Sequence, residues 1–560
     1  MGKSVRKYRK NRDYDYIAPE KASAYDIHDG KGTAHTRDDH NDLLSSPREF
    51  VPLEELAPGD STALQVVMLL VAGLVGSTVV VLPFVFLEGG FLMTIFMVLF
   101  FSLASYLASV CIVQLGVANG IYSLQGLAML AFGTRGAHAV GVIQMVLSCG
   151  LILTYLAIIF QDFPVLLGHL LHLDFDADGW PKESTTKYIT ISKILANRTL
   201  FAELFVSLPF VISMTVNTER NSLIPRYLAC GFIILIPFCL FVHSYRKIQN
   251  FAVVSTFLLL LTSLCVVGKA KYFHDENVAV ASQGFERDYM KVPKTVCQAF
   301  GVLAAQFACQ HHTFHVFYAT KDRSIDRFAR LSLVACLMAA YLAYSFGIGG
   351  YASFLSDSKT DMVENQDFNS KQGTLPFWLL VPVCALFCIP LEVVSSRYAA
   401  MFMCRARSQH HLGQEEVLFR AQPATRSQQY TSTTPPGSHS SASSFESKMA
   451  DHRHEGVVST SSYTRVQIVV TFLVLAILVQ IVALPSSINI ATLLSVTGGI
   501  AGITLLLVVP TACYLKLTPP HDDSHRPADS WLFTKCLPWS SIAVGLAASI
   551  ACVIANIVQS

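Results

Sequence analysis

Apolar residues in this chain come in long blocks separated by short polar stretches. Runs of about 20 apolar residues, enough to cross roughly 30 Å of hydrocarbon, recur from residue 63 onward. The pattern predicts eleven spans, at residues 63–87, 91–116, 137–160, 226–243, 250–268, 294–318, 331–355, 375–400, 466–484, 490–515 and 539–558. We therefore expect an all-α polytopic membrane protein with eleven transmembrane helices.

Two long polar stretches divide these spans. Residues 1–60 are charged and His-rich and predict a disordered cytosolic tail, whereas residues 401–465 contain TSTTPPGSHSSASS and predict a disordered Ser/Thr-rich cytosolic loop. Residues 61–400 then hold spans one to eight, and residues 466–560 hold spans nine to eleven.

Orientation follows from the basic residues near the span ends, which favour a cytosolic N-terminus. The connection 161–225 then lies outside and carries Asn197-Arg198-Thr199, a glycosylation sequon with Asn197 as the acceptor. The short apolar segment 200–216 within it contains Glu203 and Pro209. We expect it to lie at the interface or tucked against the bundle, and an additional span is the alternative.

Composition places the chain firmly among membrane proteins. Only 14% of its residues are charged, against roughly a quarter in soluble proteins, while 52% are apolar and the mean hydropathy is +0.46. The 14 cysteines fall almost entirely in or beside apolar runs and predict buried hydrophobic side chains rather than a disulfide framework. The net charge of +2 gives no sign of a nucleic-acid partner.

The first span contains residues that break helices. Residues 73–86 read GLVGSTVVVLPFVF, in which Gly76 loosens the helix, Pro83 removes a hydrogen-bond donor, and Ser77 and Thr78 add hydroxyl groups. A broken helix survives in lipid only against protein or a polar cavity. Its bare N–H groups suit a carboxylate and its bare carbonyls a cation, so an amino acid zwitterion fits both. The alternative is a kink that only improves helix packing.

The sixth span carries an unusual group of polar residues. Within ten residues of FGVLAAQFACQHHTFHVFY it places Gln306, Gln310, His311, His312, Thr313 and His315. Polar side chains are costly in a membrane and usually face a cavity or a partner helix, although individual histidines can be satisfied within a bundle. Spans one and six occupy equivalent positions in a five-plus-five inverted repeat.

Three motifs together resemble those of the amino acid/auxin permease family, on its branch of sodium-coupled neutral amino acid transporters. GLVGSTVVVLPFVFLEGG resembles the first span, FACQHHTFHVFYATKDRS the sixth span and its following loop, and the spacing of Pro390 and Arg397 in CIPLEVVSSR the eighth. The match covers roughly residues 60–400 and 466–558. It implies a LeuT-like 5+5 inverted repeat plus one peripheral helix, and amino acid transport driven by sodium or protons.

The resemblance also implies a set of substrate-binding residues. These are Gly76, Ser77 and Thr78 in the first span and Cys309, His311, His312 and Thr313 in the sixth. Thr78 replaces the second glycine of the family motif, which predicts a stiffer or narrower break.

The coupling ion, H⁺ or Na⁺, is the only cofactor expected. Sodium-coupled members use an asparagine in the first span and a threonine in the eighth, and these positions here are Ala72 and Cys388. Neither side chain offers the oxygen that a hard cation requires, which favours protons. Glu392 lies in apolar surroundings that favour its neutral form, so it could load and release a proton, and His311 or His312 could do the same. The alternative for Glu392 is a structural pair with Arg397 or a neighbouring helix.

The tail contains two short patterns read by sorting adaptors. Residues 39–44, DHNDLL, fit an acidic dileucine signal and residues 14–17, YDYI, a tyrosine-based one. They predict adaptor binding at the tail and favour an acidic endomembrane compartment. We expect the protein in the plasma membrane or in a lysosomal or vacuolar membrane.

Two other functions compete with transport. His311, His312 and His315 resemble a metal-binding box, but the other histidines are scattered through tails and loops, so we expect neither a metal nor an enzyme. A sensor that binds amino acid without carrying it could use the long tail and the 401–465 loop to recruit partners. The sequence favours a secondary active transporter of amino acids that works by alternating access, with proton coupling.

Overall fold

The computed structural model describes residues 59–170, 245–280, 293–354, 358, 362, 375–420, 489–518 and 537–559. Every regular element in these residues is a helix, and the only strand-like pairing among them is one parallel bridge between Ser61 and Thr320. The all-α prediction is therefore confirmed for the described residues. The predicted spans 226–243 and 466–484, the segment 200–216, Asn197 and both sorting motifs lie outside them.

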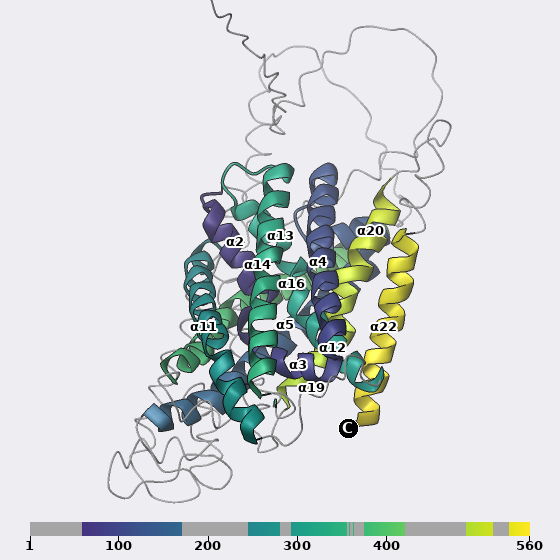
Figure 1. The fold of residues 1–560 in the computed structure, drawn as a ribbon. Helices are drawn as coiled ribbons and strands as arrows, with labels where there is room; N and C mark the ends of the chain where they lie inside the picture. The colour runs from purple at the N-terminus through teal and green to yellow at the C-terminus, as the bar shows by residue number, and fades with distance from the viewer. Residues whose placement is uncertain are drawn as a thin grey trace, which may run out of the picture. The chain divides into compact units, whose positions relative to one another are not determined.

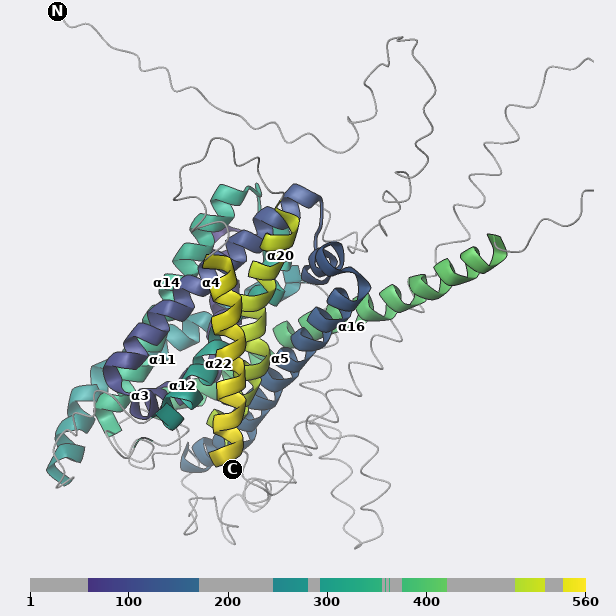
Figure 2. The same ribbon diagram turned by 90° about the vertical axis from the view of Figure 1, so that its right-hand side faces the viewer.

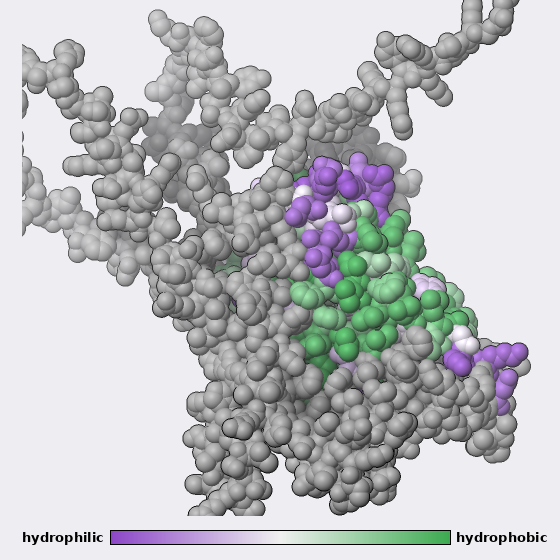
Figure 3. Space-filling model, turned by 90° about the vertical axis from the view of Figure 1, so that its left-hand side faces the viewer, coloured by the Kyte–Doolittle hydropathy of each residue, from purple (hydrophilic) through white to green (hydrophobic). Residues whose placement is uncertain are grey.

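Seven helical stretches in the described part are long and apolar enough to cross a membrane. They lie in α4 (Phe91–Asn119), α5 (Leu124–Leu170), α11 (Tyr245–Val280), α14 (Ile325–Phe354), α16 (Leu375–Arg420), the run α19–α20 (Ile490–Leu517) and α22 (Leu537–Gln559). The helices form one bundle (Figure 1). On one face an apolar band lies between two hydrophilic edges, as expected for a surface that meets lipid (Figure 3). The chain is a polytopic membrane protein, and the full count of eleven spans stays a prediction.

The first span is broken in its middle and would be the eighth candidate. Helix α2 (Ala63–Leu74) begins at a Thr62 capping box and ends just before Gly76, whose φ of +49° is left-handed and suits glycine. A 3₁₀ segment, η3 (Gly76–Val81), then leads into α3 (Leu82–Gly89), which has Pro83 in its first turn. The two halves meet at an angle of 53°. The predicted break is confirmed.

The predicted sixth span is interrupted as well. It consists of α12 (Pro293–Phe307) and α13 (Gln310–Ala319), separated by Ala308 and Cys309. Helix α13 packs beside α2, and α12 beside α3, so the two interrupted helices run in opposite directions (Figure 1). Their breaks therefore face each other inside the bundle.

The remaining helices surround this pair. Helix α4 packs against α12 and α13, while α5 and α16 lie together and both contact η3. Helix α5 is kinked at Gly133, ahead of the predicted span 137–160. Helices α19 (Ile490–Thr497) and α20 (Val509–Leu517) are joined by two π-helical segments, η6 (Gly498–Gly502) and η7 (Thr504–Val508). The lipid-facing α22 packs on them and on α12 (Figure 2).

Helix α16 is longer than the sequence suggested. The eighth span was expected to end near residue 400, yet the backbone stays helical to Arg420 and extends away from the bundle in Figure 2. The first twenty residues of the expected disordered loop are therefore helical. They are rich in Arg, Gln, Glu and Leu, which favour helix, and the Ser/Thr/Pro-rich sequence begins only later.

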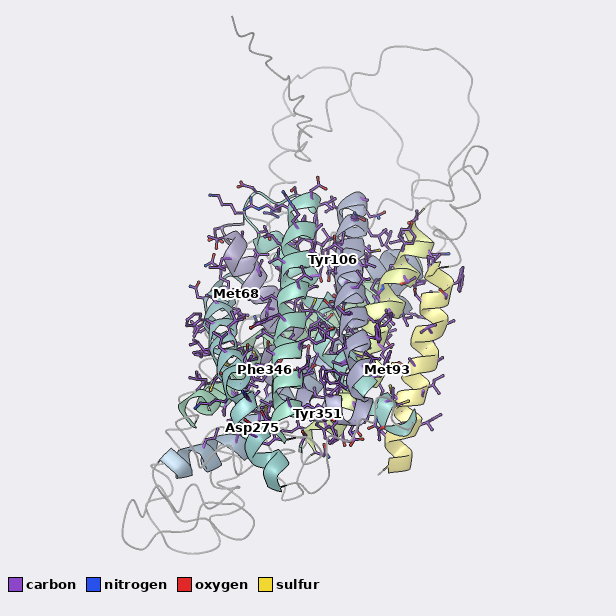
Figure 4. The ribbon with its side chains drawn as sticks, viewed as in Figure 1. Met68, Met93, Tyr106, Asp275, Phe346 and Tyr351 are labelled. Atoms are coloured by element: carbon purple, nitrogen blue, oxygen red, sulfur yellow. The ribbon has the colours of Figure 1, made fainter. Side chains whose placement is uncertain are left out.

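The beginning of the first span is tied to the end of the sixth. The Ser61 N–H donates to the Ala319 carbonyl at 3.1 Å, and the Lys321 N–H donates to the Ser61 carbonyl at 3.2 Å. The Ser61 hydroxyl also donates to the Gln249 side chain on α11. Met68 marks this half of the bundle in Figure 4, whereas Tyr351 lies in the opposite half. We call these contacts the Ser61 clamp.

Candidate functional site

A buried acid and two buried histidines form the centre of the candidate site. Glu392 of α16 and His311 and His312 of α13 are each no more than 3% exposed. His311 Nε2 lies 3.2 Å from Glu392 Oε2, and His312 Nε2 lies 2.9 Å from Glu392 Oε1. With Glu392 ionised, each Nε2 carries a proton and donates to one carboxylate oxygen. The two imidazoles thus compensate the cost of burying an acid in a membrane helix.

Local packing explains why these side chains converge. Helix α2 approaches closely at Gly73, where an added Cβ would lie 3.0 Å from His312 Cδ2. The rings of His311 and His312 lie 3.8 Å apart between centroids, so both reach the same carboxyl group. His315 points elsewhere and stacks on Tyr398. The metal-binding box suggested by the His311–His315 spacing is therefore not formed, because Glu392 takes the third position.

The break of the first span is shaped by a tyrosine from α5. An added Cβ at Gly76 would lie 2.7 Å from the Tyr155 hydroxyl oxygen and 3.5 Å from Cys388 Sγ. Gly76 is thus required both by its left-handed backbone and by the close approach of Tyr155. Thr78 stabilises the same break, since its hydroxyl donates to the Val75 carbonyl.

One side chain connects the two breaks directly. Gln306, in the last turn of α12, donates from Nε2 to the Thr78 carbonyl at 2.8 Å. Both residues are almost fully buried. The unwound segment of the first span is therefore fixed against the sixth span by a hydrogen bond between the two spans.

Cys309 and Thr313 face a different helix. Cys309 Sγ lies 3.5 Å from the Ser105 hydroxyl and 3.8 Å from that of Ser109, both on α4, and Thr313 donates to Ser109 at 3.3 Å. The predicted site residues therefore divide into three groups. Gly76, Ser77 and Thr78 lie at the first break, and His311 and His312 meet Glu392, while Cys309 and Thr313 contact α4.

Unpartnered polar atoms gather at the two breaks. Four of the buried side-chain atoms that have no hydrogen-bond partner among the described residues lie there: Ser77 Oγ, Gln306 Oε1, Gln310 Oε1 and His311 Nδ1. Buried polar atoms are nearly always satisfied in folded proteins, and each exception costs about 1–3 kcal/mol. Four such atoms on facing helix ends therefore mark a place suited to a polar ligand.

The site also has the chemistry to hold a cation. His311, His312 and Glu392 offer three ligand atoms within 4.8 Å of one another, the one such group found among the described residues. Two imidazoles and a carboxylate are a ligand set known for zinc. The expected sodium positions differ, since the Ala72 side chain has no oxygen and Cys388 presents a sulfur, 3.6 Å from the Ser255 hydroxyl.

Two interrupted, antiparallel membrane helices whose breaks carry unsatisfied polar atoms define a membrane transport protein. Comparison with known proteins supports this class. The model of the family described as transmembrane amino acid transporter protein matches residues 59–558, and the chain belongs to this family. The expected family and a membrane location are thereby confirmed.

Two relatives show the same relationship at low identity. The chain is 20% identical over 330 residues to the mouse (Mus musculus) sodium-coupled neutral amino acid transporter 11, an alignment covering 57% of this chain and 60% of the relative. It is 23% identical over 133 residues to vacuolar amino acid transporter 2 of Saccharomyces cerevisiae, covering 24% of this chain and 25% of that protein. The matched part thus spans about three-fifths of the mouse protein and about one-quarter of the Saccharomyces cerevisiae protein. Both are named as transporters and neither as an enzyme, in agreement with our expectation.

Neither the role of Tyr155 nor the hydrogen bond from Gln306 to Thr78 could be predicted from the sequence. A tyrosine in an apolar run has the same pattern as a core residue. Gln306 did stand out as a polar residue in the sixth span, but its partner lies 228 positions earlier in the chain.

Proposed function

We propose that this protein is a secondary active transporter that moves amino acids across a membrane by alternating access, coupled to protons. The substrate would lie between the break at Gly76–Thr78 and the break at Phe307–Gln310. Cys309 and Thr313 would hold the second break in place through their contacts with Ser105 and Ser109 of α4. The proposal includes the LeuT-like arrangement of eleven spans as two inverted repeats of five plus one, for which the antiparallel pair of interrupted helices is the main support.

The observation that carries the proposal is the set of unpartnered buried atoms at the two breaks. Helices α2 and α12 end there with the negative ends of their dipoles, while α3 and α13 begin there with the positive ends. A free amino acid carries one charge of each sign a few bonds apart. It would therefore satisfy both kinds of helix end at once, which a purely anionic or cationic solute could not do.

Proton coupling is supported by the group of Glu392, His311 and His312. These residues join α16 to α13, immediately beside the second break, so a change in their protonation acts where α13 must move. Glu392 pairs with His311 and His312 of the neighbouring helix α13, an arrangement that the structural alternative, a pair with Arg397 or a neighbouring helix, also allows. His311 Nδ1 has no partner among the described residues and can accept a further proton.

Sodium coupling is the second candidate, because the mouse relative is named as sodium-coupled. At the positions expected for sodium ligands, this chain places an alanine and a cysteine. Sodium requires oxygen ligands, so these positions favour protons. We further propose that the protein has no resident metal, that Asn197 is glycosylated, and that sorting adaptors bind the N-terminal tail.

The test is uptake by the purified full chain reconstituted in liposomes. Each of the twenty common amino acids is offered under an imposed pH gradient, and then under an imposed sodium gradient. We expect accumulation of at least one amino acid driven by the pH gradient without sodium. Accumulation driven by sodium alone would contradict proton coupling. Binding of an amino acid without uptake under either gradient would replace the transporter by the sensor.

A further inference from the structure

The proposed function leaves open which atoms of the protein recognise the charged amino group of a substrate. Gln306 offers the clearest geometry for this role. It sits in the last turn of α12, it is 1% exposed, and its Nε2 donates to the Thr78 carbonyl at 2.8 Å. Because a carbonyl can only accept, this bond fixes the orientation of the amide: its nitrogen faces Thr78, and its oxygen must face away.

The fixed orientation leaves Gln306 Oε1 as an acceptor with no partner among the described residues. The oxygen and nitrogen of an amide lie roughly 2.2 Å apart by its bond lengths, so Oε1 lies at most about 5 Å from the Thr78 carbonyl oxygen. The Ser77 hydroxyl, one residue before Thr78, is also buried and unpartnered. The two facing helix breaks thus each contribute one buried oxygen atom without a hydrogen-bond partner.

The surroundings favour a cationic donor over a neutral one. Gln306 lies one residue before the end of α12, and α2 ends at Leu74, so the negative ends of two helix dipoles are close. Glu392 is the buried acid of the site, but its two oxygens are already engaged by His311 and His312. A compact ammonium group, with three N–H donors, matches two oxygen acceptors and this potential.

We propose that Gln306 Oε1 accepts a hydrogen bond from the α-ammonium group of the transported amino acid, while its Nε2 holds the two helix breaks together. This inference rests on the proposed function, since it identifies a substrate-binding residue of the same site. It assigns Gln306 a direct contact with substrate and gives the protein a means of distinguishing amino acids from the corresponding hydroxy acids.

The test compares substrates that differ only at the amino group. The probes are L-alanine, L-leucine and whichever amino acid the wild-type protein takes up fastest, each measured against the 2-hydroxy acid of the same side chain. Affinities are measured on the full chain, purified in detergent, for the wild type, Gln306→Met and Gln306→Glu. Gln298→Met is the matched control, because Gln298 is a buried glutamine on the same helix more than two turns from the break.

We expect the wild type to prefer the amino acid, and Gln306→Met to reduce that preference roughly 10- to 100-fold, the range for a hydrogen bond to a charged group. Gln306→Glu keeps an acceptor while removing the donor to Thr78, so it should retain the preference even where both affinities fall. Gln298→Met should leave the preference unchanged.

Two results would overturn the inference and are distinguishable from failure of the proposed function. Equal losses for amino acid and hydroxy acid in Gln306→Met would show that the residue only connects the helices, or that water satisfies Oε1. Loss of the preference in Gln306→Glu would lead to the same conclusion. Absence of uptake of every amino acid by the wild type would instead refute the proposed function itself.

Discussion

Replacing Gly76 with alanine tests the broken first span most sharply. The φ of Gly76 is +49°, a conformation that costs a residue with a Cβ about 1–3 kcal/mol. The new Cβ would also lie 2.7 Å from the Tyr155 hydroxyl oxygen, a distance that requires one of them to move. If the broken conformation loses about 1–3 kcal/mol against alternatives, the ratio of broken to alternative conformations falls roughly 5- to 150-fold. We expect uptake to fall by up to this factor.

The two contributions can be separated with a double-mutant cycle. Tyr155→Phe removes the hydroxyl, so the nearest ring atom, Cζ, would lie 3.4 Å from the new Cβ, and Gly76→Ala should then be partly rescued. The matched control is Gly268→Ala on α11, where nothing lies within 4 Å of an added Cβ. The assays are liposome uptake and the melting temperature in detergent. Gly76→Ala with wild-type uptake and melting temperature would refute the need for a left-handed residue at the break.

Three further predictions concern the Ser61 clamp and the buried group of Glu392, His311 and His312, which we call the triad. Glu392→Gln should abolish accumulation driven by a pH gradient while amino acid exchange continues. The control Glu88→Gln, which changes a half-buried acid at the end of the first span, should retain both activities. Accumulation driven by a pH gradient in Glu392→Gln would exclude Glu392 from coupling. Metal analysis of the purified protein should find no stoichiometric zinc or iron, and one metal per chain that is lost in His312→Ala would make the triad a metal centre. Gly59→Ala brings a Cβ into collision with the Thr320 carbonyl oxygen and should speed hydrogen exchange at the Lys321 amide. Unchanged exchange would show that the clamp tolerates the added atom.

The broken spans were predictable from sequence because their signals are local. Gly76 and Pro83 are residues that interrupt helices, and they stand within a run that is otherwise apolar. The histidine-rich stretch of the sixth span was equally conspicuous, and the interruption at Cys309 falls inside it. Composition and hydropathy likewise sufficed for the all-α membrane class.

The contacts between spans were not predictable from sequence. Glu392 and the histidines appeared as competing proton carriers. In the structure they share hydrogen bonds, although Glu392 lies 80 and 81 positions after the two histidines in the chain. Nothing in the apolar run around Tyr155 distinguishes it from a residue that merely fills the core. The end of α16 was misplaced because hydropathy predicts only where the chain leaves the lipid. The residues that follow still favour helix, and the helix therefore continues to Arg420.

The central claim is that an amino acid lies between two interrupted helices. The most direct measurement is an experimental structure of the full chain with a transported amino acid bound. Our account predicts substrate density contacting both the segment from Gly76 to Thr78 and the segment from Gln306 to Gln310. A substrate bound elsewhere, or a continuous α-helix through residues 74–82, would contradict it.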